Sequence, residues 1–90
     1  MSTYVDIGHG VSIEIRHVAG ETEPAGVAYK HPDGKGGTCE GWAPFNGHPG
    51  GRHGEGWDVE SLQPLTISPS LLCRICGNHG FIRNGVWVPA

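Results

Sequence analysis

The feature that most constrains this chain is a pair of cysteines, Cys73 and Cys76, followed at once by a glycine. In a Cys-x-x-Cys-Gly turn both thiolates point toward one ion, and the glycine permits a tight left-handed bend. The chain has three cysteines, so a disulfide framework would leave one unpaired, whereas a metal site uses three thiolates and one imidazole without remainder. The sequence therefore predicts a zinc knuckle rather than disulfides.

Length and composition limit the fold around that turn. Ninety residues suffice for one domain with a modest core, and the 16 glycines and 7 prolines favour turns over helix interiors. We expect a small β-rich, zinc-ribbon-like single domain over residues 1–90, with short antiparallel strands, long glycine-rich loops and little helix. Its expected parts are N-terminal strands in 1–30, a Gly/His-rich loop containing Cys39 in 31–57, and the knuckle with a C-terminal hairpin in 65–90.

Alternation of apolar and polar residues marks the expected strands. Residues 11–18 place Val11, Ile13 and Ile15 on one face of a strand. Residues 26–30 form a second candidate and residues 65–68 a brief third. Segment 57–64 is predicted to form at most one helical turn, ended by its proline. The large aromatic residues, including all three tryptophans, are expected in the core because so small a domain has few others.

The dipeptide Asn84-Gly85 predicts a hairpin over residues 81–88. Asn-Gly readily adopts the positive φ angles of a type I′ turn. In that register Ile82 pairs with Trp87, with Arg83–Val86 and Phe81–Val88 as the neighbouring pairs. Because side chains alternate between faces, Ile82 and Trp87 are expected on one side of the hairpin.

The residues favoured as ligands of one structural zinc ion are Cys39, Cys73, Cys76 and His79. Cys39 lies 34 positions before Cys73, so it comes from a separate loop and closes the site across the domain. His79 follows Cys76 by three positions, and His31, eight positions before Cys39, is the alternative fourth ligand. Four protein ligands close the tetrahedron and leave no position for water or substrate, so the predicted site is structural.

Charge and hydropathy narrow the expected partners. Six Lys+Arg against nine Asp+Glu give a formal charge of -3 without a basic block, so nucleic acid is not favoured. No apolar run approaches the ~20 residues of a membrane helix, and no leader resembles a signal peptide, so no membrane partner is expected. The predicted location is the cytoplasm of the producing host cell.

Two histidines, His48 and His53, lie in the glycine-rich loop and raise the question of catalysis or a second metal. No carboxylate pair or nucleophile accompanies them at a recognisable spacing. A compact metallohydrolase or His-Asn-His-type nuclease that uses them with Asn78 is therefore the least favoured hypothesis. The sequence predicts a protein that is not an enzyme.

The last third of the chain resembles the end of a family of small uncharacterised proteins that are frequent in phage genomes. The resemblance lies in Leu-Thr-Ile-Ser-Pro-Ser at 65–70 and Cys-Gly-Asn-His-Gly-Phe-Ile-Arg-Asn-Gly at 76–85. It implies that Cys76 and His79 are ligands and that an earlier loop supplies a partner pair, here Cys39 and His31. This chain departs from the family by adding Cys73 and by carrying one cysteine where the family often has two or three.

Together these observations predict a non-enzymatic zinc-binding protein with a structural or interaction role. The family resemblance implies that it is encoded by a phage. A small virion component of the capsid or tail is the specific form of this hypothesis, with a protein partner or self-assembly. The alternative is a zinc-ribbon regulator that binds nucleic acid.

Overall fold

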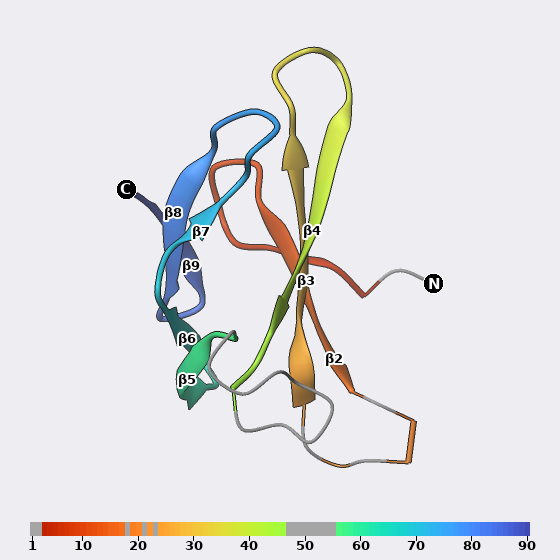
Figure 1. Ribbon diagram of the computed structural model, residues 1–90, viewed down its shortest axis with the longest axis vertical. Helices are drawn as coiled ribbons and strands as arrows, with labels where there is room; N and C mark the ends of the chain where they lie inside the picture. The colour runs from red at the N-terminus through yellow and green to blue at the C-terminus, as the bar shows by residue number, and fades with distance from the viewer. Residues whose placement is uncertain (1–2, 18, 21, 23, 47–55) are drawn as a thin grey trace.

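The computed structural model describes residues 3–17, 19–20, 22, 24–46 and 56–90. These residues form nine short β-strands and no helix, arranged in three antiparallel sheets (Figure 1). The prediction of a small β-rich domain with short antiparallel strands is confirmed, and its His/Cys cluster is compatible with a zinc-ribbon-like fold. The strands are β1 (Val5–Asp6), β2 (Ser12–His17), β3 (Pro24–Pro32), β4 (Thr38–Pro44), β5 (Asp58–Leu62), β6 (Leu65–Ser68), β7 (Leu71–Leu72), β8 (His79–Arg83) and β9 (Val86–Pro89).

The largest sheet has the order β1-β2-β3-β4 and packs one face against the core. Its inner face carries rows of paired residues, among them Ile15, Val27 and Ala43 on successive strands. Val27 and Ala43 have no exposed surface. The alternation seen in residues 11–18 is confirmed by β2, and the candidate at 26–30 is the middle of a nine-residue strand.

The prediction of a continuous loop over residues 31–57 is wrong at its start. Strand β3 runs on to Pro32, and β4 returns antiparallel to it after a tight turn. The Asp33 carboxylate holds that turn by accepting the backbone N–H of Lys35 at 2.7 Å and of Gly37 at 2.9 Å. Tertiary pairing thus overrides a glycine-rich composition. His48 and His53 lie outside the described residues.

Segment 58–62 is also a strand, where a helical turn was expected. β5 pairs with β6 through a bulge between Val59 and Ser61, and the chain turns at Gln63 and Pro64. Leu65 and Ile67 of β6 alternate with more exposed residues and are buried in the core. Because β6 is thereby fixed as a strand, segment 58–62, which pairs with it, is extended as well. The brief strand expected at 65–68 is confirmed.

The C-terminal hairpin has the predicted register. Ile82 pairs with Trp87, and the turn residues Asn84 and Gly85 have φ angles of 53° and 75°. Ile82 and Trp87 are both buried, as the expected face requires. The Trp87 backbone N–H also donates to the Ile7 carbonyl at 2.8 Å, which connects this sheet to the N-terminal segment.

The described residues form one apolar core, which lies between the large sheet and the two smaller ones. It contains Ile7, Val11, Ile13, Val27, Ala43, Phe45, Leu65, Ile67, Leu71, Ile82 and Trp87, with Trp57 packed against it. Trp42 departs from the prediction that all tryptophans are buried, because it is 46% exposed on the outer face of the large sheet. Its ring covers Gly26, where a Cβ would approach ring carbons to 2.7 Å.

Candidate metal centre

One half of the candidate site is the turn end of the β3–β4 hairpin. His31 and Cys39 are direct cross-strand partners, so their side chains lie on the same face of the sheet, and both are buried. The Tyr29 ring stacks parallel to the His31 imidazole with ring centroids 6.3 Å apart. Tyr29 also lies over Gly41, where a Cβ would come within 2.3 Å of that ring. Gly41 therefore leaves room for the Tyr29 ring, which stacks on the His31 imidazole.

The other half is the turn between β7 and β8, which carries Cys73 and Cys76. The Cys73 backbone N–H donates to the Asn78 carbonyl, and the Gly77 N–H donates to the Cys73 carbonyl, each at 2.8 Å. Gly77 has φ 79°, the left-handed conformation expected of the glycine after the second cysteine. The turn has the backbone of a zinc knuckle, and it lies at the same end of the molecule as the β3–β4 turn (Figure 1).

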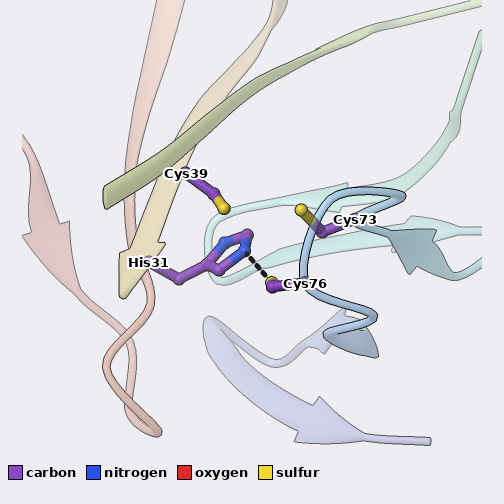
Figure 2. Close-up of side chains that lie close together, drawn as sticks. All are labelled: His31, Cys39, Cys73 and Cys76. Atoms are coloured by element: carbon purple, nitrogen blue, oxygen red, sulfur yellow. Dashed lines mark hydrogen bonds between the residues drawn. The ribbon is translucent and has the colours of Figure 1, made fainter. Parts of the chain in front are cut away.

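The two halves bring four ligand atoms together. The His31 nitrogen and the sulfurs of Cys39, Cys73 and Cys76 all lie within 4.8 Å of one another (Figure 2). His31 Nε2 is 3.3 Å from Cys76 Sγ. Zn–S bonds of about 2.3 Å at tetrahedral angles place sulfurs about 3.8 Å apart, so the cluster has the dimensions of a zinc site. Within the described chain, no other group of three or more His, Cys, Asp or Glu side chains is so arranged.

The structure distinguishes His31 from His79, the two histidines that the sequence offers as the fourth ligand. His31, the alternative fourth ligand, lies among the three cysteines, whereas His79 is not in the cluster. His79 Nε2 instead lies 2.7 Å from the Ser70 hydroxyl, and its ring stacks on Phe81. A hairpin centred on Lys35, with glycines at 34, 36 and 37, would have paired residues 31 and 39. That pairing is the signal that could have identified His31 from the sequence.

The environments of two thiols differ sharply. Backbone N–H groups of Cys76 and Ile75 point at the Cys73 sulfur and, with the nearby His31 and Cys76 side chains, lower its pKa to about 6. Burial, together with the neighbouring Cys73 and Cys76, raises the pKa of Cys39 to about 12. At neutral pH and without a cation, these shifts favour a thiolate at Cys73 and a neutral thiol at Cys39. A divalent cation would favour the Cys39 thiolate and so offset the effects of burial and of the neighbouring sulfurs, which raise the pKa of Cys39.

These pKa shifts predict how zinc affinity depends on pH. The Cys39 proton must leave when zinc binds at any pH below about 12, so the affinity falls as the pH falls. Below about pH 6 the Cys73 thiolate is protonated as well, and the slope steepens. We expect the affinity to fall at least about tenfold per unit of pH between 9 and 6. Competition titrations with a zinc chelator of known pH dependence measure this slope, and a pH-independent affinity would contradict it.

Comparison of the chain with protein-family models, with curated proteins and with solved structures found no match. The kinship with the phage family accordingly stays a prediction. The described residues contain no helix that is long and apolar enough to cross a lipid bilayer. The functional argument therefore rests on the geometry of the His31, Cys39, Cys73 and Cys76 cluster.

Proposed function

We propose that this protein is a non-enzymatic zinc-binding protein in which one structural Zn²⁺ joins the β3–β4 hairpin to the knuckle. The observation that carries the proposal is the convergence of three thiols and one imidazole from two sheets within 4.8 Å. Three soft thiolates with an imidazole are a donor set that suits zinc. All four positions of a tetrahedral ion would be filled by protein, which leaves none for a water or a substrate.

The distribution of apolar contacts supports the proposal of a metal ion at this end of the molecule. Leu71 is the last core residue before the knuckle, and the core resumes only at Ile82. Between them the turn has little to bury, because Leu72 is 52% and Ile75 81% exposed. Small domains with limited cores commonly rely on a metal or disulfides. The zinc ion would hold the knuckle where apolar packing is missing.

The choice of ligands predicts opposite behaviour for two histidine variants. We expect native protein to hold one zinc per chain and His31→Ala to lower zinc affinity at least about 100-fold, because one of four ligands is lost. His79→Ala is the matched control and should keep the full zinc complement, since that side chain lies outside the cluster. Inductively coupled plasma mass spectrometry and chelator competition measure both quantities. Zinc loss from His79→Ala with retention in His31→Ala would contradict the assignment.

The interaction part of the proposal draws on the outer face of the large sheet. Trp42 is exposed there, and Lys30 lies 4.2 Å from the centroid of the Tyr4 ring. Arg16 lies over the same ring and pairs with Glu14 at 2.7 Å. Exposed aromatic and arginine side chains are enriched at protein interfaces. We propose that this face binds a protein partner or a second copy, and that assembly into a virion is the form suggested by the phage-family resemblance.

A nucleic-acid-binding regulator is the competing proposal for the same face, because aromatic rings beside Lys30 and Arg16 also suit stacked bases. Glu14 and Glu40 lie on that face and offset the two cations, which favours a protein partner. A salt titration with duplex and single-stranded DNA separates the two proposals. Phosphate contacts are strongest at low salt, so low salt is the most sensitive condition for detecting DNA binding. Because we favour a protein partner, we expect no DNA binding even at low salt.

A further inference from the structure

We propose that Cys76 is a modification site, at which a hydroperoxide oxidises the sulfur, Cys73 closes a disulfide onto it, and the zinc ion is released. The inference rests on the proposed zinc centre and adds a reversible, oxidant-dependent control to it. It is carried by the unequal access of solvent to the three cysteines. Cys39 is buried, Cys73 is half-buried, and Cys76 is exposed.

An open cleft leads to Cys76. It has a volume of about 400 Å³, and its lining includes His9, His31, Asp33, Cys76 and Asn78. Of the three cysteines, only Cys76 lines this cleft. A hydroperoxide as small as hydrogen peroxide therefore reaches the Cys76 sulfur from solvent without any movement of the backbone. It reaches the buried Cys39 sulfur only after the site opens.

The position of Cys73 makes it the partner in the second step. It lies three residues before Cys76 on the same turn, and the two sulfurs lie within 4.8 Å. The ends of such a four-residue turn are within about 7 Å at Cα, near the span that a disulfide requires. Cys39 belongs to the opposite hairpin and its side chain is buried, so it is less accessible to the oxidised Cys76 sulfur than Cys73, which shares the turn with Cys76. The disulfide should therefore join Cys73 to Cys76 and leave Cys39 reduced.

The chemistry balances with the hydroperoxide as the sole oxidant. The Cys76 thiolate attacks the terminal peroxide oxygen, the O–O bond breaks, and the alkoxide or hydroxide that leaves takes a proton from water. The Cys73 thiolate then attacks the resulting sulfenic sulfur, an S–S bond forms, and hydroxide leaves. Two electrons pass from the two sulfurs to the peroxide. Zn²⁺ keeps only His31 and Cys39 as ligands and passes into solution.

The experiment treats zinc-loaded full-length protein with one equivalent of hydrogen peroxide in the presence of a chromogenic chelator. Trypsin cleaves after Lys35, Arg52, Arg74 and Arg83, so each cysteine falls in a separate peptide, 36–52, 53–74 or 75–83. We expect one zinc released per chain, a disulfide that joins the second and third peptides, and Cys39 alkylated in the first. Dithiothreitol followed by zinc should restore the metal content.

Two variants with the same ligand composition sharpen the test. Cys76→His and Cys39→His each leave two cysteines and two histidines, but only Cys76→His removes the thiol from the cleft. We expect peroxide-driven zinc release from Cys76→His to be at least about tenfold slower than from Cys39→His, because only Cys39→His keeps the thiol that lines the cleft. Where either variant does not hold zinc, the peptide map of the native protein decides.

The outcomes distinguish this inference from the metal centre itself. Native protein that holds no zinc before oxidation would overturn the proposed centre, and this inference with it. One zinc per chain that survives peroxide, a first disulfide that includes Cys39, or equal release from the two histidine variants would overturn the inference alone. A Cys73–Cys76 disulfide with stoichiometric zinc release would support it.

Discussion

Cys39→Ser is expected to lose its zinc and to lower the free energy of unfolding by at least about 4 kcal/mol at zinc concentrations a thousandfold above the dissociation constant of the native protein. The substitution removes a buried candidate ligand of the β3–β4 hairpin, and a serine hydroxyl does not replace a thiolate on zinc. Because metal binding is coupled to folding, the lost binding free energy appears as lost stability. Urea unfolding followed by circular dichroism, with zinc and with excess chelator, measures the difference.

The control for this prediction is native protein stripped of metal. If the effect of Cys39→Ser comes from the ion, the variant and the stripped native protein should have free energies of unfolding within about 1 kcal/mol of each other. Chelator should then change the variant little. A variant as stable as zinc-loaded native protein, or a native protein whose stability chelator leaves unchanged, would show that the ion does not hold this fold.

Trp87→Ala is expected to lower the free energy of unfolding by about 3–5 kcal/mol, the usual cost of removing a large buried aromatic side chain. Trp87 is 5% exposed and belongs to the core where the hairpin meets the large sheet. Its ring fills the space above Gly80, where a Cβ would approach two ring carbons to 2.6 Å. Chemical unfolding of zinc-loaded protein measures the loss.

Val86→Ala is the matched control, because Val86 is the neighbouring residue on β9 and is 49% exposed. Its effect should stay within about 0.5 kcal/mol. Zinc affinity measured under folding conditions should stay near the native value in both variants, since neither residue belongs to the metal cluster. Equal losses from Trp87→Ala and Val86→Ala would refute the assignment of the hairpin faces.

The parts of the fold that the sequence predicts are those set by local chemistry. Asn84-Gly85 determines its own turn type and therefore the pairing of Ile82 with Trp87. The Cys73–Cys76 turn is equally local, because its glycine and spacing lie within five residues. Strand β2 is visible because its apolar residues alternate without interruption.

The strands that could not be predicted from composition are those whose structure depends on pairing with another strand. Strand β4 contains glycine and proline and looks like a loop until β3 pairs with it. Strand β5 resembles a short helical start, and pairing with β6 makes it extended. The histidine of the His/Cys cluster depended on the same information, because His31 lies beside Cys39 only through the β3–β4 hairpin, which composition does not indicate. Proximity in sequence favoured His79, which the fold directs toward Ser70.

The direct pairing of His31 with Cys39 has a consequence for the order in which the chain assembles. Each half of the cluster is closed by a short segment, one of eight positions and one of three, so each can form early and independently. The remaining step spans the 34 positions from Cys39 to Cys73, and its loop-closure entropy exceeds that of the eight-position hairpin by about 1.3 kcal/mol. We therefore expect the last step of assembly at this end of the domain to be the encounter of two preformed pairs of candidate metal ligands, His31 with Cys39 and Cys73 with Cys76.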